Sequence, residues 1–225
     1  MSGLPKPFYE DGSVTIFHGD CRELLPEIEA EVLVTDPPYG INHFSGRSSG
    51  MYGPMARYRM RIAGDENAAD RDNVLRAWGS RPALVFGTWK VTRPNGTRAV
   101  LIWDKTEASG MGDLSLPWKP SHEEIYVLGK GFTGHRGGGV LRVYTPPRVA
   151  MGRRHPNEKP VDLLRSLIAK CPEGTILDPF MGSGTTLRAA KDLGRKAIGI
   201  ELEERYCEIA AERCSQEVLD LGAAA

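Results

Sequence analysis

The hydrophobic positions of the chain alternate between short apolar runs and stretches with helical spacing. Apolar runs bounded by turn residues predict strands at 13–20, 32–35, 83–88, 99–103, 123–128, 175–178 and 196–200. Apolar residues three and four positions apart predict helices at about 21–28, 66–78, 160–170, 185–193 and 203–219. Strands that alternate with helices in this way indicate an α/β fold built on a mostly parallel, doubly wound sheet.

Three stretches show neither pattern and are rich in glycine, proline and arginine, namely 41–64, 106–121 and 131–154. Loops of that length in a compact domain usually carry function. After the last of them, Asn157 is the expected cap of the 160–170 helix, with Pro160 in its first turn. We expect a single catalytic domain over 1–225, because 225 residues suffice for one ordinary globular core.

The composition narrows the class of protein. No apolar stretch reaches the ~20 residues of a transmembrane helix, and residues 1–10 lack the apolar centre of a signal peptide, so a cytoplasmic protein is expected. The four cysteines form no Cys-x-x-Cys pair. We therefore expect reduced thiols, no disulfide framework and no metal site.

A formal net charge of zero conceals strong segregation along the chain. Residues 41–64 hold four arginines and no acid (+4), whereas residues 130–159 hold seven basic residues against one acid (+6). Residues 201–220 hold seven acids against two arginines (−5). The two basic segments are candidate contacts for a phosphate backbone, although such runs also occur as ordinary solvated surface.

A candidate catalytic loop follows the 32–35 strand and consists of Asp36, Pro37, Pro38 and Tyr39. The prolines fix the backbone and lack N–H donors. The carboxylate can accept hydrogen bonds from an amino group while the aromatic ring stacks on a planar base. The loop is thus suited to methylating an exocyclic amine, although four residues alone are a weak signal.

A second candidate site follows the 175–178 strand, where Gly182 and Gly184 precede a predicted helix. Glycines allow the backbone to approach a ligand, and Glu201 lies 17 residues after Gly184, a spacing at which an acid in this fold binds ribose hydroxyls. The third glycine of the dinucleotide pattern is absent, which favours S-adenosylmethionine over NAD. A glycine turn that serves packing alone is the other interpretation.

The two motifs, together with His155-Pro-Asn-Glu-Lys-Pro160 between them, resemble the amino-methylating DNA methyltransferases. Because the catalytic motif precedes the cofactor motif, the order is similar to the beta class, a circular rearrangement of the Rossmann-like methyltransferase fold. The resemblance covers about residues 13–215 and is weakest over 41–64 and 106–154. It implies a site-specific DNA methyltransferase that uses S-adenosylmethionine, flips its target nucleotide out of the duplex and serves DNA methylation, as in restriction–modification.

The resemblance also implies roles for individual residues. The cofactor would contact Asp20, Lys159, Pro160, Asp178, Phe180, Gly182, Ser183, Gly184, Thr185 and Glu201. Two of these have ordinary alternatives, since Asp20 is also a suitable helix cap and Lys159 a solvated lysine. No metal ligand is implied. Double-stranded DNA, a second copy of the chain and a cognate restriction enzyme are the implied partners.

We expect Asp36 and the Pro37 carbonyl to accept the two hydrogens of the target amine, with Tyr39 stacked on the base. The segment 41–64 is expected to be a mobile loop that closes over the flipped nucleotide, and about 106–155 a target-recognition insert. Phosphate or guanine contacts are expected from Arg47, Arg57, Arg59, Arg61, Arg136, Arg142, Arg148, Arg153 and Arg154. Trp89 and Trp103, at strand ends, are predicted to belong to the core rather than to stack on bases.

Aspartate rather than serine at position 36 resembles the enzymes that methylate N6 of adenine, with N4 of cytosine as the alternative. An RNA or protein-amide methyltransferase fits less well, because in those enzymes the cofactor motif comes first. A nucleic-acid-binding protein without catalysis would have no use for an intact Asp36 beside an intact glycine turn.

Overall fold

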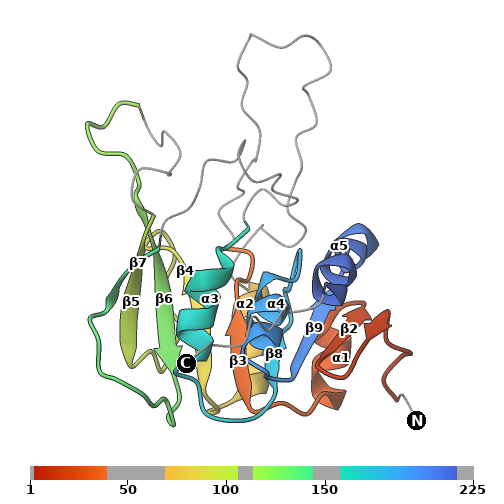
Figure 1. Cartoon of the computed structure of the whole chain (residues 1–225). Coiled ribbons are helices and arrows are strands. Elements are labelled where there is room, and N and C mark those ends of the chain that lie inside the picture. Colours follow the sequence, from red (N-terminus) through yellow and green to blue (C-terminus); the bar gives the residue numbers. More distant parts are fainter. Residues whose placement is uncertain (1–2, 40–68, 106–113, 144–157, 217–225) are drawn as a thin grey trace, which may run out of the picture.

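The computed structural model describes residues 3–39, 69–105, 114–143 and 158–216 (Figure 1). Its centre is a nine-stranded sheet with the strand order β1-β2-β9-β8-β3-β4-β6-β5-β7. The strands are β1 (Tyr9–Glu10), β2 (Val14–His18), β3 (Val32–Thr35), β4 (Ala83–Gly87), β5 (Ala99–Asp104), β6 (His122–Leu128), β7 (Val140–Arg142), β8 (Ile176–Asp178) and β9 (Ala197–Glu201).

Most neighbouring strands run in the same direction. The pairs β2–β9, β9–β8, β8–β3, β3–β4 and β5–β7 are parallel, whereas β1–β2, β4–β6 and β6–β5 are antiparallel. The predicted mostly parallel, doubly wound sheet is therefore confirmed. Because β6 runs against its neighbours, its first residues lie at the edge where the parallel strands end, at the top of Figure 1.

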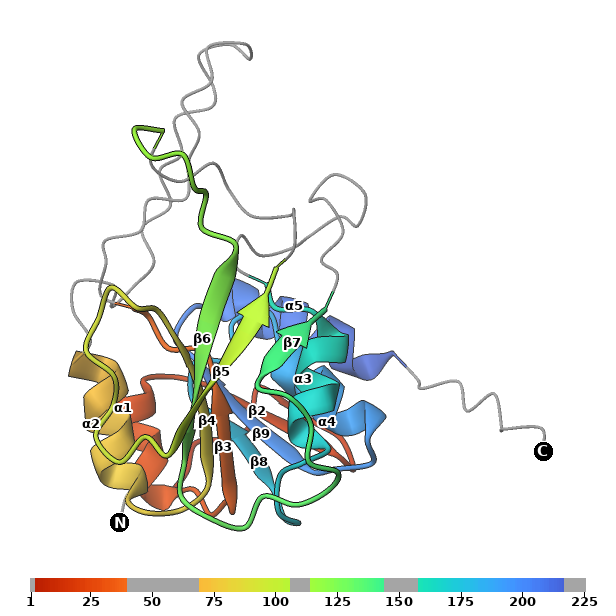
Figure 2. The same ribbon diagram turned by 90° about the vertical axis from the view of Figure 1, so that its left-hand side faces the viewer.

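Helices cover both faces of the sheet (Figure 2). One face carries α1 (Cys21–Leu24), the 3₁₀ turn Leu25–Glu27 and α2 (Ala69–Trp78). The other face carries α3 (Val161–Ile168), α4 (Thr185–Asp192) and α5 (Glu204–Ser215). Strand side chains alternate between these layers: Val32 and Val34 pack toward α3 and α4, and Leu33 packs toward α1 and α2.

The helices differ from the predicted ones mainly at their ends. The helix predicted over 21–28 is α for only four residues and continues as a 3₁₀ turn, with Pro26 at its beginning. Pro160 takes the cap position of α3, with extended backbone and no side-chain cap bond. The predicted cap Asn157 and residues 66–68 and 217–219 of the predicted helices lie outside the described residues.

Two strands were not predicted. The short edge strand β1 precedes the first predicted strand, and β7 lies within a segment that showed no pattern. Of the two tryptophans predicted for the core, Trp103 is buried, whereas Trp89 is 66% exposed, so the prediction for Trp89 was wrong. Trp89 follows the end of β4, where the chain leaves the sheet.

None of the helices in the described part of the chain is long and apolar enough to cross a bilayer. All four cysteines are buried free thiols. They contribute to the two apolar layers on either side of the sheet.

Candidate functional site

The two sequence motifs meet at the tips of two neighbouring strands. Strands β3 and β8 pair in parallel, with Val32 opposite Ile176 and Leu33 opposite Leu177. At the end of the pair, the Thr35 hydroxyl donates to Asp178 Oδ1 at 2.7 Å. Because Asp36 directly follows Thr35, the candidate catalytic loop and the glycine turn leave the sheet side by side (Figure 1).

Both carboxylate oxygens of Asp36 have a donor. The Tyr39 hydroxyl donates to Oδ1 at 2.8 Å, and the Lys159 ammonium contacts Oδ2. Lys159 is only 7% exposed, so the solvated-lysine interpretation was wrong. Between Asp36 and Tyr39, Pro37 is buried and Pro38 is half-buried. Because proline has no backbone N–H, neither residue leaves a buried donor without a hydrogen-bond acceptor.

Sequence reasoning missed two members of this cluster, Glu123 and Lys105. Glu123 Oε2 lies 3.3 Å from Lys159 Nζ and 3.2 Å from the Tyr39 hydroxyl, and Glu123 Oε1 contacts Lys105 Nζ. Lys105 directly follows β5 and Glu123 stands near the start of β6. The reversed direction of β6 places Glu123 at the edge where β5 ends and Lys105 follows, and no local pattern predicts that reversal.

The cluster of Asp36, Glu123, Lys105 and Lys159 is electrically balanced, with two carboxylates and two ammonium groups. Burial works against the ionisation of Glu123, yet the ammonium groups of Lys159 and Lys105 lower its pKa. Burial likewise works against Lys159, yet Asp36 and Glu123 raise its pKa. Burial and the same two carboxylates raise the pKa of Tyr39 well above its ordinary value. Lys159 and Glu123 are therefore charged and Tyr39 is a neutral donor.

The glycine turn has the backbone that its sequence predicts. Gly182 and Gly184 have φ of 50° and 76°, and Gly184 caps α4. A Cβ on Gly184 would lie 2.6 Å from the Cβ of Ala210 in α5, so the turn packs directly on that helix. From α5, the Arg213 guanidinium donates to the hydroxyls of Thr185 at 2.6 Å and Ser183 at 3.3 Å.

Glu201, at the end of β9, holds the same turn from the other side. Its Oε2 accepts the amide of Gly182 at 3.0 Å and its Oε1 accepts the amide of Glu203 at 2.8 Å. Burial raises the pKa of Glu201. Each oxygen keeps a lone pair that a ligand hydroxyl can use.

Asp178 is 2% exposed. It accepts hydrogen bonds from Thr35, the Phe180 amide and Thr186, but burial prevails and raises its pKa to about 6. The ion pairs found in the described part of the chain do not include Asp178. A buried carboxylate of this kind fits a positively charged ligand group, as the ammonium and sulfonium of S-adenosylmethionine would be.

The remaining predicted cofactor residues border the turn or lie on nearby strand ends. Phe180 and Pro160 are half-buried, at the start of the turn and at the cap of α3. Asp20, after β2, caps α1 by accepting the Arg22 amide at 2.9 Å and pairs with the Arg22 guanidinium at 2.5 Å. Asp20 therefore does act as the helix cap that its position suggested, and a ligand role for it stays a prediction.

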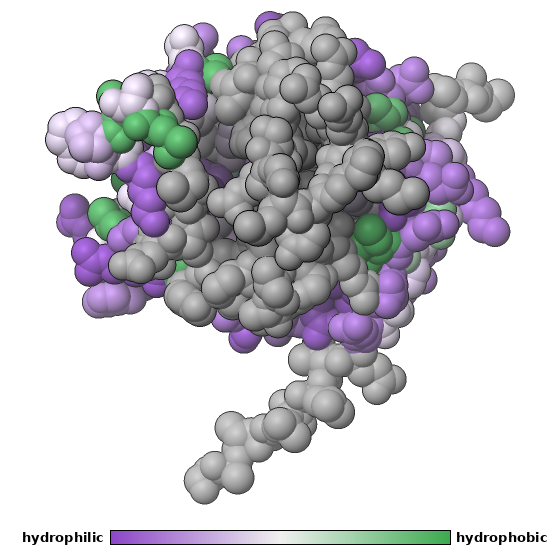
Figure 3. All heavy atoms as spheres, turned by 90° about the horizontal axis from the view of Figure 1, so that it is seen from above, coloured by the Kyte–Doolittle hydropathy of each residue, from purple (hydrophilic) through white to green (hydrophobic). Residues whose placement is uncertain are grey.

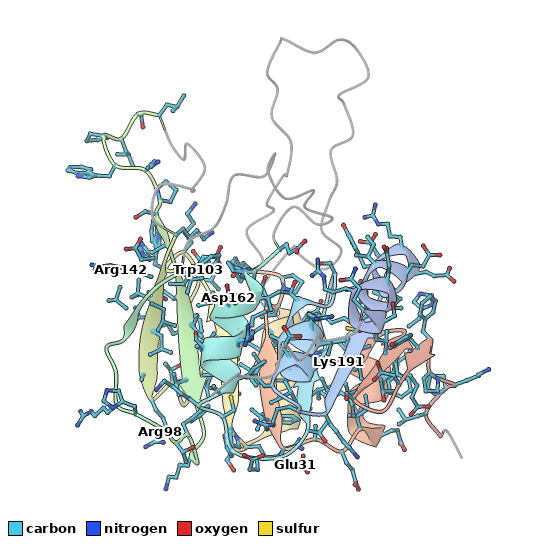
Figure 4. The ribbon with its side chains drawn as sticks, in the orientation of Figure 1. Glu31, Arg98, Trp103, Arg142, Asp162 and Lys191 are labelled. Atoms are coloured by element: carbon cyan, nitrogen blue, oxygen red, sulfur yellow. The ribbon has the colours of Figure 1, made fainter. Side chains whose placement is uncertain are left out.

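Few of the predicted DNA-binding arginines are described. Arg142, at the end of β7, is highly exposed, and its Nε lies 3.5 Å from Asp104 Oδ2. Figure 4 shows Arg142 near the site edge of the sheet. Arg136 is exposed in the loop before β7. The others lie outside the described residues: Arg47, Arg57, Arg59, Arg61, Arg148, Arg153 and Arg154.

The segment that leads into β6 exposes three large apolar side chains. Leu114, Leu116 and Trp118 are 78%, 57% and 79% exposed. The segment rises beyond the site edge of the sheet (Figure 1). Figure 3, viewed onto that edge, shows apolar residues among hydrophilic ones on the side of β5 and β6.

Within the described ranges, no three His, Cys, Asp or Glu side chains cluster in a way that would hold a metal ion. The site described above consists of charged side chains and a glycine turn.

Comparison with known proteins gives concordant results. A family model described as DNA methylase (N6_N4_Mtase) matches residues 95–212. The Type II methyltransferase M.ScaI of Streptomyces caespitosus is 29% identical over 97% of this chain and 86% of its own. The matched segment of the family model includes Glu123, Lys159, the glycine turn and Glu201, and the match to M.ScaI extends over nearly the whole chain.

Two solved structures share the fold. The M1.HpyAVI–SAM complex is 22% identical with a TM-score of 0.59, covering 89% of this chain and 99% of that one. The PvuII DNA methyltransferase, titled cytosine-N4-specific, is 17% identical with a TM-score of 0.67, covering 95% and 90%. The predicted Rossmann-like methyltransferase fold is thereby confirmed.

Proposed function

The chain belongs to the N6/N4 family of DNA methylases, and on that premise we propose that it methylates N6 of adenine in a nucleotide flipped out of double-stranded DNA. The observation that supports this best is the pair of neighbouring strand tips. One tip presents Asp36 and Tyr39, and the adjacent tip presents Asp178 and the glycine turn. A base and a methyl donor bound at these tips would be neighbours.

S-adenosylmethionine, the cofactor with which M1.HpyAVI was solved, supplies an activated methyl group on a sulfonium. In this chain, Asp178 would face the charged methionine portion and Glu201 the ribose hydroxyls. The backbone of the glycine turn would approach the cofactor closely, at Gly182, Ser183, Gly184 and Thr185. The wall of the cofactor pocket would be formed by Phe180, Lys159 and Pro160, and Asp20 would lie on the adenine side. The unpaired charge of Asp178 and the positive-φ glycines support this arrangement.

The exocyclic nitrogen is a poor nucleophile because its lone pair is delocalised into the ring. Asp36 and the Pro37 carbonyl would accept its two hydrogens and so orient the lone pair toward the methyl group. The new C–N bond would form as the C–S bond breaks, with S-adenosylhomocysteine as the leaving group. The nitrogen would become cationic and would then release one proton to solvent. The Asp36 carboxylate stabilises the positive charge that develops beside it.

Tyr39 would stack on the flipped base. Its hydroxyl donates a hydrogen bond to Asp36 Oδ1 at 2.8 Å, which fixes the ring relative to the carboxylate. Flipping costs a few kcal/mol, which stacking and phosphate contacts offset. Exposed Arg136 and Arg142, and the predicted basic residues of 41–64 and 148–154, are the proposed source of phosphate contacts.

N4 of cytosine is the second candidate target, because its amine presents the same two hydrogens to Asp36. The fold likeness to the PvuII enzyme, titled cytosine-N4-specific, keeps this candidate open. A homodimer and a cognate restriction enzyme are further proposals that follow from the resemblance of the chain to beta-class enzymes.

The decisive experiment incubates the protein with S-adenosylmethionine carrying a labelled methyl group and unmethylated double-stranded DNA. The DNA is then digested to nucleosides that are separated by chromatography. Label in N6-methyl-2′-deoxyadenosine supports the proposal, and label in N4-methyl-2′-deoxycytidine selects the second candidate. Absence of label from DNA, with label in RNA or in a protein substrate supplied in parallel reactions, would overturn both.

A further inference from the structure

We propose that Glu123 is a positioning residue that receives the Lys159 ammonium from Asp36 when the target amine enters the site. The inference rests on the proposed function, since it concerns how Asp36 becomes available to the amine. It assigns a role to a carboxylate that belongs to neither sequence motif.

The geometry places two donors between two carboxylates. Lys159 Nζ contacts Asp36 Oδ2 and lies 3.3 Å from Glu123 Oε2. The Tyr39 hydroxyl lies 2.8 Å from Asp36 Oδ1 and 3.2 Å from Glu123 Oε2. Both donors can therefore change acceptor through a small side-chain rotation, without movement of the sheet.

The arrangement creates a competition at Asp36. The target amine needs a hydrogen-bond acceptor on this carboxylate. Tyr39 already donates to Oδ1 and Lys159 to Oδ2, so one acceptor position on each oxygen is taken. Lys159 is buried and charged, so it cannot leave Asp36 without another anion, because a buried unpaired charge is very unfavourable. Glu123 supplies that anion.

Glu123 is held in place for this role. Its Oε1 contacts Lys105, which leaves Oε2 directed at Lys159 and Tyr39. Lys159 is also confined, because it precedes Pro160 and its ammonium lies 5.1 Å from the Phe86 ring centre. The ammonium can thus exchange between two fixed carboxylates.

The exchange changes the electrostatics at the reacting nitrogen. While Lys159 contacts Asp36, its positive charge opposes the cationic nitrogen that methylation produces. With Lys159 on Glu123, the Asp36 carboxylate faces the amine with less compensation, which favours the transition state. Glu123 acts through Lys159 and need not touch the substrate.

The test is the single-turnover rate of methyl transfer to DNA by Glu123→Gln. The variant keeps the size of the side chain but removes the charge that holds Lys159, so the rate is expected to fall about tenfold, equivalent to about 1.4 kcal/mol. The affinity for S-adenosylmethionine, measured by calorimetry, should not change. A wild-type rate in Glu123→Gln would overturn the inference.

Glu124→Gln is the matched control. Glu124 is the next residue of β6, is buried and pairs with Arg93 at 2.7 Å, but it faces the opposite side of the strand. Its replacement removes a buried carboxylate and its ion pair from the same strand without touching the site. The rate should stay at the wild-type value even where thermal unfolding shows a similar loss of stability.

The double variant Glu123→Gln with Lys159→Met separates positioning from simple structural support. Because Lys159 also borders the proposed cofactor site, both variants are compared at saturating S-adenosylmethionine. Without the competing ammonium, Asp36 is open to the amine, so the double variant should be faster than Glu123→Gln alone. If Glu123 only supported the fold, the second substitution would slow the reaction further. A slower double variant would therefore overturn the inference.

A structure of the wild-type protein with DNA and a cofactor analogue provides a test that does not depend on any variant folding. Lys159 Nζ should lie within hydrogen-bond distance of Glu123 Oε2 and beyond it from Asp36 Oδ2. Lys159 remaining on Asp36 beside a bound amine would refute the exchange. A wild-type protein that transfers no label to DNA would refute the proposed function itself, which is a different outcome.

Discussion

The ammonium of Lys159 contacts the carboxylate of Asp36 across a separation of 123 residues in the chain. Asp36 directly follows β3 and Lys159 lies just before α3, so the contact joins the candidate catalytic loop to the helix that packs beside α4. The predicted cofactor-binding lysine is thus also part of the immediate surroundings of the predicted catalytic carboxylate. Predictions about either residue must take the other into account.

Replacing Asp36 with Asn should reduce methyl transfer to DNA by at least about 100-fold, because the acceptor loses its charge while the shape of the loop is kept. Affinity for S-adenosylmethionine, measured by calorimetry, should survive, since Lys159 retains Glu123 as a partner. Asp36→Ala should behave in the same way. Loss of both transfer and cofactor binding would indicate misfolding or a wrong assignment of the loop.

Replacing Glu201 with Gln should weaken S-adenosylmethionine binding about tenfold, because a charged acceptor is lost both for the ribose and for the Gly182 amide. Glu203→Gln is a suitable control, as Glu203 pairs with Arg205 at 2.6 Å outside the turn. Calorimetry on the two variants gives the comparison. Equal affinities in Glu201→Gln and the wild type would remove Glu201 from the ribose site.

Asp178 predicts opposite effects of pH on folding and on cofactor binding. Its pKa in the folded protein, about 6, lies above the ordinary 3.8, so the folded state binds this proton more tightly than the unfolded state. The free energy of unfolding should therefore fall as pH rises from about 4 to about 6, by roughly 3 kcal/mol from this group alone. Denaturant unfolding of the wild type and of Asp178→Asn, which cannot ionise, isolates the effect.

Affinity for a cationic cofactor should change in the other direction. The ionised form of Asp178 attracts the ligand, so binding of S-adenosylmethionine should strengthen as pH rises through about 6. Calorimetry between about pH 5 and about pH 8, which brackets this pKa, measures the dependence. A binding constant that is flat with pH would show that Asp178 does not face the charged part of the cofactor.

The two glycines of the turn should respond differently to alanine. Both have positive φ, which costs about 1 kcal/mol for a residue with a Cβ. At Gly182 the new Cβ meets nothing within 4 Å, whereas at Gly184 it meets Ala210 at 2.6 Å. Gly184→Ala should therefore lower the melting temperature more, and adding Ala210→Gly should restore part of the loss. Equal melting temperatures for the two single variants would contradict the packing of the turn on α5.

The exposed tryptophans predict a contribution to DNA binding. Trp89 follows the end of β4 and Trp118 precedes the start of β6, both at the site edge, and they are 66% and 79% exposed. Stacking on an unpaired base is worth about 1–3 kcal/mol, so Trp118→Ala and Trp89→Ala should each weaken DNA affinity by about tenfold. Trp→Phe variants, which keep a ring, should lose less. Fluorescence anisotropy with labelled DNA measures this, and unchanged affinity would assign the side chains to another role.

Much of the architecture follows from the sequence because parallel strands have a strict geometric consequence. The apolar runs at 32–35 and 175–178 each end in an acid followed by a turn, and parallel strands present their ends at one edge. The convergence of Asp36 and Asp178 was therefore predictable. The positive-φ glycines were predictable for a local reason, since only glycine adopts that backbone without strain.

Glu123 was not predictable, because its position depends on the direction of β6, and the role of Lys105 was missed with it, because its carboxylate partner is Glu123. A strand with two acids near its start, Glu123 and Glu124, looks the same in sequence whichever way it runs in the sheet. The burial of Lys159 was missed for another reason. Its carboxylate partners come from β3 and β6, far away in the chain, and a lysine without visible partners is assigned to the surface.

Strands β3 and β8 are bonded directly to each other, although most of the chain runs between them. The distance between Asp36 and Asp178 therefore does not depend on the length of the connections between β3 and β8. A substitution or insertion in those connections should therefore leave the two carboxylates at neighbouring strand tips.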